Sequence, residues 1–260
     1  MSLDRPAWGL ALGGGAVRGH AHVGAIEALE AAGLRPDYLA GTSAGALVAS
    51  LLGFGLDAAR IAAALVDLKW RSVSRVSLRR SGIFSNRELG DLCEELLGSA
   101  DLRDAATPLA VVAADIGTGE RVLLREGPVS EAVRASSAIP GIFEPVEIGG
   151  RMLVDGSIVE NVPARAAREL GADVVAAISL DSGLDFAAPH RIMEVLVNAF
   201  EISVASASSV QLGRDADVVV RPELGPYRHW DTGAAEAIRA EGRRAVRDAI
   251  PQIERAIGPR

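Results

Sequence analysis

The stretch Tyr38–Leu52, with the sequence YLAGTSAGALVASLL, places a serine between a short apolar strand and an apolar helix. Its centre, Gly41-Thr42-Ser43-Ala44-Gly45, has the spacing G-x-S-x-G. At such a junction the serine lies on a sharp, strained turn that projects its hydroxyl, and small residues two positions away on each side avoid backbone clashes. The following helix directs N–H dipoles toward the turn and favours negative charge there. The pattern predicts Ser43 as a nucleophile, and the alternative is a plain strand-to-helix turn.

Apolar runs of strand length alternate with helical patterns on both sides of this stretch. Predicted strands cover Trp8–Leu12, Tyr38–Ala40, Leu109–Ala114, Arg121–Leu124, Val146–Ile148, Arg151–Val154, Val174–Leu180 and Asp217–Val220. Predicted helices cover Arg18–Ala32, Ala44–Leu52, Asp57–Leu68, Val129–Ser136, Pro163–Leu170, Arg191–Leu212 and Ala234–Ile257, the last broken near Pro251. A further helix is predicted to run to Leu97 from a capping box formed by Ser85 and Glu88. This alternation predicts an α/β fold with a mostly parallel sheet covered on both faces. No internal repeat or low-complexity tract interrupts it, so we expect one domain over residues 1–260.

The composition excludes several classes of protein. The chain has 260 residues, of which 49% are apolar and 23% charged, which excludes a disordered chain. A net charge of −7 argues against a nucleic-acid-binding protein. With 45 alanines, 28 glycines and 4% aromatic residues, the core must be built mostly from small side chains. The sole cysteine, Cys93, forms no intrachain disulfide. Neither a membrane-spanning run nor a signal-peptide pattern is found, so we expect a cytoplasmic protein.

A glycine-rich loop, Gly13–Gly19 (GGGAVRG), follows the first predicted strand. Glycines let the backbone approach a ligand and let successive N–H groups point the same way, so such a loop can bind an oxyanion or a phosphate. It is neither a P-loop nor a dinucleotide fingerprint, because the G-K-[ST] ending is absent and Ala16 stands where G-x-G-x-x-G needs glycine. The alternative is a tight turn required for packing.

A reactive serine needs a base. A Ser–Asp–His order is met by Ser43, Asp155 and His229, although no local pattern supports that choice of histidine over the others. Asp155 ends a predicted strand and precedes Gly156-Ser157, which leaves its carboxylate at a strand tip. By itself it has the pattern of a turn aspartate.

Taken together, these residues resemble the patatin-like phospholipase family, in particular its small bacterial members. The resemblance runs from about Trp8 to Leu180 and is carried by the loop ending in Arg18-Gly19, the elbow Gly41–Gly45 and the pair Asp155-Gly156. Ala135–Phe143 (ASSAIPGIF) resembles the segment before the family's aspartate, and Asn161-Val162-Pro163 the segment after it.

The resemblance implies a three-layer α/β/α sandwich and a Ser–Asp dyad without histidine. Ser43 would be the nucleophile and Asp155 its base, and N–H groups around Gly14, Gly15 and Ala16 would form the oxyanion hole. The reaction would be hydrolysis of carboxylic esters of lipids through an acyl-serine, with no metal or cofactor. The chain departs from the family at Ala16, where another glycine is usual, and at Ser157, where glycine or alanine is usual. These departures motivate an alternative, a weakly active or non-catalytic binding protein on the same fold.

Two basic features have two interpretations each. Arg18 either binds a substrate phosphate or carboxylate, or locks the loop by pairing with an acid. The stretch Lys69–Arg80 holds five positive charges and no acid. It is either a solvated loop or a contact with anionic lipid headgroups, which would make the protein peripheral at a membrane.

Overall fold

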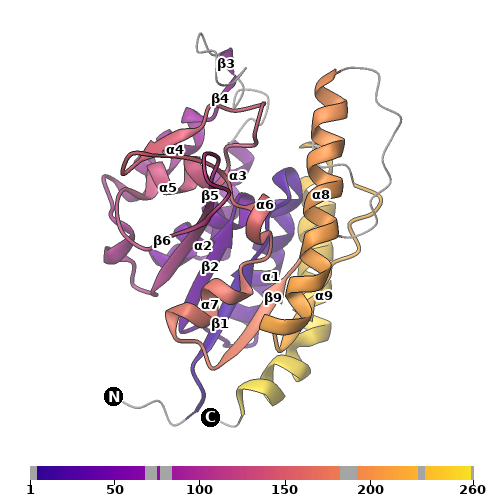
Figure 1. Ribbon diagram of the computed structural model, residues 1–260. Helices are drawn as coiled ribbons and strands as arrows, with labels where there is room; N and C mark the ends of the chain where they lie inside the picture. The colour runs from indigo at the N-terminus through magenta and orange to yellow at the C-terminus, as the bar shows by residue number, and fades with distance from the viewer. Residues whose placement is uncertain (1–4, 68–74, 77–83, 182–191, 228–231, 259–260) are drawn as a thin grey trace.

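The computed structural model describes residues 5–67, 75–76, 84–181, 192–227 and 232–258 (Figure 1). An eight-stranded sheet forms its centre, in the order β10-β9-β1-β2-β5-β8-β7 with β6 also paired to β5. Its strands are β1 (Trp8–Leu12), β2 (Tyr38–Thr42), β5 (Leu109–Asp115), β6 (Arg121–Leu124), β7 (Val146–Ile148), β8 (Arg151–Asp155), β9 (Val174–Ile178) and β10 (Val218–Val220). A separate pair is formed by β3 (Arg75–Val76) and β4 (Phe84–Ser85). The strands from β10 to β5 are parallel, whereas β6, β7 and β8 pair antiparallel.

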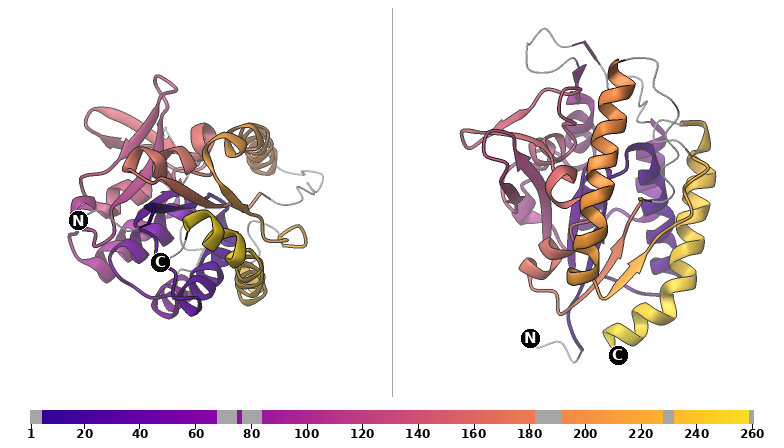
Figure 2. Two further views of the ribbon diagram at one scale, coloured as in Figure 1. Left: turned by 90° about the horizontal axis from the view of Figure 1, so that it is seen from below. Right: turned by 45° about the vertical axis from the view of Figure 1, so that its right-hand side comes forward.

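Helices cover both faces of this sheet, as the left view of Figure 2 shows. They are α1 (His20–Ala31), α2 (Ala44–Gly53), α3 (Ala58–Asp67), α4 (Arg87–Leu97), α5 (Val129–Ser136), α6 (Ser157–Glu160), α7 (Ala164–Leu170), α8 (Ile192–Asp215) and α9 (Ala235–Ile257). Short 3₁₀ turns lie at Ala16–Gly19, Leu102–Asp104 and Thr232–Ala234. The predicted α/β class with a mostly parallel sheet between helical layers is confirmed.

Side chains that alternate along the strands divide the core in two. On one face, Leu10, Leu39 and Val111 belong to a large cluster with α1 to α5 and α9. On the other face, their neighbours Ala11 and Ala40 belong to a smaller cluster with α7 and α8. Ala167 of α7 and Ala172, just after that helix, approach the sheet closely. A Cβ at Gly9 would lie 2.9 Å from the Cβ of Ala172 and 3.0 Å from that of Ala167. Close packing of small residues accounts for part of the alanine and glycine excess.

Strand β5 has three partners, and their arrangement brings two distant parts of the chain together. Its residues 109–112 pair with β2, residues 111–114 with β6 and residues 113–115 with β8. Because a strand has only two edges, these overlaps place β6 on one edge and both β2 and β8 on the other. The C-terminal ends of β2 and β8 therefore meet beside β5, where Thr42 lies opposite Val112 and Asp155 opposite Ala113.

One prediction about the helices is wrong. Helix α9 continues through Pro251 to Ile257 instead of breaking there. A proline inside a helix removes one backbone hydrogen bond and bends the axis without necessarily ending the helix, and Figure 2 shows α9 bending toward its C-terminal end.

Within the described residues, no helix has the length and apolar character needed to cross a membrane.

Candidate active site

Ser43 lies on the turn between β2 and α2 in a conformation that residues other than glycine rarely adopt. Its φ is 53° and its ψ is −121°. Such a conformation costs on the order of 1–3 kcal/mol and persists only where its surroundings enforce it. A Cβ at Gly41 would lie 2.4 Å from the carbonyl oxygen of Gly45, and one at Gly45 would lie 2.0 Å from that of Leu12. These close approaches explain why both flanking positions are glycine.

The Ser43 hydroxyl donates a hydrogen bond of 2.8 Å to Asp155 Oδ2. Both residues are buried, with 8% of Ser43 and 1% of Asp155 exposed. The other oxygen, Oδ1, accepts the backbone N–H of Ser157 at 2.8 Å. Gly156 sits against β5, where a Cβ would lie 2.2 Å from the carbonyl oxygen of Val112. One carboxylate oxygen is therefore held by the backbone while the other faces the serine.

Burial raises the pKa of Asp155 from 3.8 to about 6, although hydrogen bonds from Ser157 and Ser43 oppose this shift. Burial disfavours the ionised carboxylate, and hydrogen bonds donated to it favour it. A carboxylate with this pKa is ionised at neutral pH and is a stronger base than an exposed aspartate. The site thus holds a base whose pKa lies closer to pH 7, where general-base catalysis is more efficient.

The glycine loop lies against Ser43. A Cβ at Gly14 would lie 2.5 Å from Ser157 Oγ, 2.7 Å from Asn161 Oδ1 and 3.3 Å from Ser43 Cβ, so this glycine is required by space. The Gly14 N–H already donates to the carbonyl of Asn161 at 3.1 Å. Gly14, predicted as an oxyanion-hole donor, therefore directs its N–H at this carbonyl in the structure.

Gly15 and Ala16 differ from Gly14, because among the described residues their N–H groups donate to no other atom. Gly15 has φ +157° and faces Leu180, whose Cδ1 would lie 2.9 Å from an added Cβ. Ala16 has φ +47°, in the left-handed region. In that region the Cβ of an L-residue crowds the following carbonyl oxygen, so Ala16 adds backbone strain of about 1 kcal/mol to the loop.

Arg18 holds the loop from the far side and is 3% exposed. Its Nε and Nη2 donate to the carbonyl of Tyr227 at 3.0 and 2.8 Å, and Nη1 donates to that of Leu180 at 3.4 Å. These partners are backbone carbonyls and not the acid that the sequence interpretation expected. Burial lowers the pKa of Arg18, and the charges of Glu201 and Asp181 oppose this lowering. Gly19 is required because a Cβ there would lie 2.9 Å from that of Ala44.

Neither of the two histidines that the structure describes, His20 and His22, hydrogen-bonds to Ser43 or Asp155. His22 is fully buried, its Nε2 lies 2.7 Å from the carbonyl of Gly13, and burial lowers its pKa to about 4. The neutral imidazole therefore donates to the glycine loop. Burial also lowers the pKa of His20. His190 and His229 lie outside the described residues, as does most of the Lys69–Arg80 stretch.

The sequence analysis assigns no role to Ser136, whose side chain contacts the backbone of Ser43. Its Oγ accepts the N–H of Ser43 at 2.8 Å and donates to the carbonyl of Val112 at 2.6 Å. The only signal was its place in the segment Ala135–Phe143 that resembles the family. The sequence likewise indicates no role for Asn161, whose side-chain amide donates to Asp181 Oδ2 at 2.8 Å.

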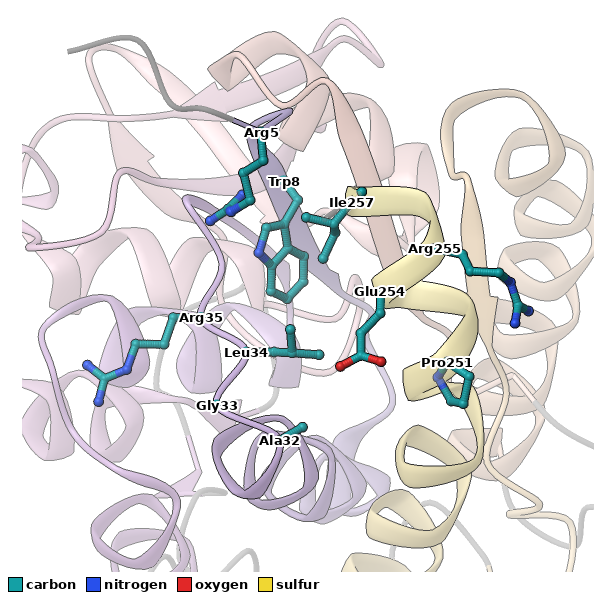
Figure 3. A pocket seen from close by; sticks show the side chains of 11 residues that line it. Arg5, Trp8, Ala32, Gly33, Leu34, Arg35, Pro251, Glu254, Arg255 and Ile257 are labelled. Atoms are coloured by element: carbon teal, nitrogen blue, oxygen red, sulfur yellow. The ribbon is translucent and has the colours of Figure 1, made fainter. Parts of the chain in front are cut away.

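Two further kinds of ligand site, a metal site and a cavity away from Ser43, were sought in the described part of the chain. There, no group of three or more histidine, cysteine or acidic side chains is arranged to hold a metal ion. A cavity of about 980 Å³ lies between the start of β1, the α1–β2 connection and the end of α9. Figure 3 shows Trp8, Leu34 and Ile257 around it, with Arg35 and Arg255 directed away. It is at the N-terminal ends of the parallel strands, opposite Ser43.

The family profile described as Patatin-like phospholipase matches residues 10–168, which include the glycine loop, the elbow and Asp155. The chain belongs to the patatin-like phospholipase family. An uncharacterised NTE family protein of Mycobacterium tuberculosis is 35% identical over 198 residues, covering 75% of this chain and 54% of that protein. Lysophospholipase nte1 of Emericella nidulans is 31% identical over 182 residues, covering 68% of this chain and 12% of that protein. The chain spans about half the length of the mycobacterial relative.

Solved structures with low sequence identity share the fold of this patatin-like phospholipase family member. VipD from Legionella pneumophila superimposes with a TM-score of 0.57 at 17% identity, covering 96% of this chain and 68% of VipD. A chain of the SpcU–ExoU complex from the type III secretion system of Pseudomonas aeruginosa superimposes with a TM-score of 0.51 at 16% identity. The match covers 95% of this chain and 52% of that chain. These likenesses concern the fold alone.

Proposed function

We propose that this chain is a serine acyl hydrolase that cleaves carboxylic esters of lipids, with Ser43 as nucleophile and Asp155 as base. The observation that carries the proposal is the 2.8 Å hydrogen bond from Ser43 Oγ to the buried Asp155 carboxylate. Family membership and the relative named as a lysophospholipase support lipid esters as the substrate class. We further propose that residues 1–260 form one domain and that the protein meets lipid at the surface of a membrane or micelle.

The chemistry follows from the arrangement of the two side chains. As Ser43 Oγ attacks the ester carbonyl carbon, its proton passes to Asp155 Oδ2. The negative oxygen that forms is stabilised by the N–H groups of Gly15 and Ala16, which donate to no atom of the residues that the structure describes. Collapse of this intermediate breaks the C–O bond, and Asp155 returns the proton to the departing alcohol. This leaves an acyl group on Ser43 Oγ. Asp155 then takes a proton from a water molecule while the water oxygen attacks the acyl carbon. The acyl–Oγ bond breaks, the carboxylic acid leaves, and Asp155 returns the proton to Ser43 Oγ.

Two substitutions test the dyad through hydrolysis of a short-chain nitrophenyl ester. Ser43→Ala removes the nucleophile, and Asp155→Asn removes the base while keeping the side-chain shape. Both variants should lose turnover by at least about 10³-fold, as expected for groups that act directly in the transition state. Turnover unchanged in folded Ser43→Ala would refute the proposal.

The alternatives make different predictions in the same assay. A triad hydrolase would lose activity in His229→Ala or His190→Ala, whereas the dyad retains it in both. A binding protein on this fold would hydrolyse no ester even as wild type and would resist a fluorophosphonate probe. The strained Ala16 is the feature that favours this alternative, while Ser157, through its backbone N–H, holds Asp155 in place.

A further inference from the structure

The hydroxyl of Ser136 occupies a place where the β2–β5 ladder would otherwise continue. Leu39 N–H donates to the carbonyl of Pro108 at 2.9 Å, in the register that pairs Leu39 with Leu109. Bonds from one strand of a parallel pair recur every second residue. By that period, the rungs that follow would join Gly41 to Ala110 and then Ser43 N–H to the carbonyl of Val112.

At the last of these positions, Ser43 N–H and the Val112 carbonyl do not bond directly, because the Ser136 hydroxyl lies between them. Ser43 N–H donates to Ser136 Oγ at 2.8 Å, and Ser136 Oγ–H donates to the Val112 carbonyl at 2.6 Å. The hydroxyl thus uses one acceptor site and its only proton, at a position with no exposed surface. The inserted oxygen lengthens the rung, so the chain leaves β5 at Ser43 without an unpaired buried N–H or carbonyl.

The residues after Ser136 hold the other member of the dyad. The carbonyl of Ala138 accepts the backbone N–H of Asp155 at 2.9 Å. Residues 136–138 therefore contact the backbone of Ser43 through a side chain and the backbone of Asp155 through a carbonyl. The two reacting residues come from different strands, and this short segment is a common support for both.

We propose that Ser136 is a positioning residue that keeps Ser43 displaced from β5 so that its hydroxyl reaches Asp155. The inference rests on the proposed function, because positioning has meaning only for a reaction at Ser43. Without the inserted hydroxyl, Ser43 N–H and the Val112 carbonyl either lose their partners or bond directly. A direct bond draws Ser43 toward β5 and away from Asp155. Misplacement by about 1 Å can cost about 100-fold in rate.

Ser136→Ala and its neighbour Ser137→Ala form a matched pair for the test. The Ser137 side chain makes no hydrogen bond to another described residue, so its loss controls for removing a buried serine oxygen from this segment. With nitrophenyl butyrate, Ser136→Ala should lower kcat about 10- to 100-fold with KM within about twofold of wild type. Its rate of Ser43 labelling by a fluorophosphonate should fall in parallel. Ser137→Ala should match wild type in both.

Ser136→Thr keeps the hydroxyl and should recover most of the lost kcat, whereas Ser136→Cys keeps the shape but bonds weakly and should not. The Cys variant also decides the question if Ser136→Ala does not fold. A folded Ser136→Ala or Ser136→Cys protein with wild-type kcat, measured where Ser43→Ala is inactive, would overturn the inference. Turnover that survives in Ser43→Ala would instead refute the proposed function, so the two failures are distinguishable.

Discussion

Asp155 is a buried carboxylate whose neighbours within bonding distance are hydroxyl and N–H groups. Its pKa is raised to about 6 chiefly by burial, so the carboxylate becomes protonated as pH falls through 6 and no longer accepts the Ser43 proton. We therefore expect kcat/KM for a neutral ester to fall about tenfold per pH unit below 6 and to level off above 7. A steady-state profile from pH 4.5 to 8.5 measures this. A midpoint near 4 would contradict the assigned environment of the base.

The raised pKa of Asp155 also affects the stability of the protein. Activity is expected to rise with pH, whereas the contribution of Asp155 to the free energy of unfolding is expected to fall. A carboxyl group that binds its proton more tightly in the folded state contributes stability at low pH and loses it as pH rises through about 6. Asp155→Asn removes the buried charge and should stabilise the protein at pH 8 by about 2–3 kcal/mol, an increase of several degrees in Tm. At pH 4 the gain should vanish. Thermal unfolding at both pH values checks this, and a destabilised variant at pH 8 would refute it.

Ala16, whose N–H belongs to the proposed oxyanion hole, has φ +47°. Ala16→Gly relieves the strain, and we expect it to raise the free energy of unfolding by up to about 1 kcal/mol while Ser43 labelling stays at or above the wild-type rate. Ala31→Gly, in the last turn of α1, provides the comparison and should destabilise by about 0.5–1 kcal/mol. Urea unfolding measures the free energy of unfolding of both variants. An equal decrease in both would contradict the inferred strain at Ala16.

At this scale the sequence predicts the residues whose signal is local. Ser43 lies in a five-residue pattern, and Asp155 lies at a strand tip before glycine. The engagement of the Gly14 N–H was not predictable, because its partner Asn161 lies far along the chain and the contact depends on tertiary packing. Ser136 was missed for a similar reason, since its role depends on the register between β2 and β5.

At the scale of elements, the crossing of α1 and α9 depends on two glycines. A Cβ at Gly24 would lie 1.8 Å from the carbonyl oxygen of Arg239, and one at Gly242 would lie 2.0 Å from that of Ala21. Gly24→Ala should therefore destabilise by about 2–4 kcal/mol despite alanine's higher helix propensity. Gly213→Ala, in α8 with open space around it, should stabilise by about 0.5–1 kcal/mol. Thermal unfolding measures the Tm of both variants. A similar change in Tm for Gly24→Ala and Gly213→Ala would contradict the close packing of α1 against α9.

Most elements were predictable because helix and strand periods are local properties of the chain. The continuation of α9 through Pro251 was not, since packing against the rest of the protein outweighs the propensity of one residue. The pairing of both β2 and β8 with one edge of β5 was also not predictable from the sequence. Pairing order along a sheet depends on contacts between residues distant in the chain.

At the scale of the whole molecule, the last helix supports the first loop. Helix α9 packs along α1, Glu27 of α1 pairs with Arg239 and Arg243 of α9, and α1 begins directly after the glycine loop. If residues 1–260 form one domain, the loss of helical signal in urea and the loss of Ser43 labelling should coincide in a single transition. Circular dichroism and probe labelling on the same samples test this. Two separate transitions would refute the single-domain prediction.

The central claim is that Ser43, activated by Asp155, forms the covalent bond to substrate. The most direct measurement is mass-spectrometric mapping of the site that a fluorophosphonate modifies in the folded wild-type protein at pH 8. We expect one adduct on the peptide that contains Ser43, at least about 100-fold slower labelling in Asp155→Asn, and none in Ser43→Ala. An adduct on Ser136, Ser137 or Ser157, or an undiminished rate in Asp155→Asn, would contradict the account.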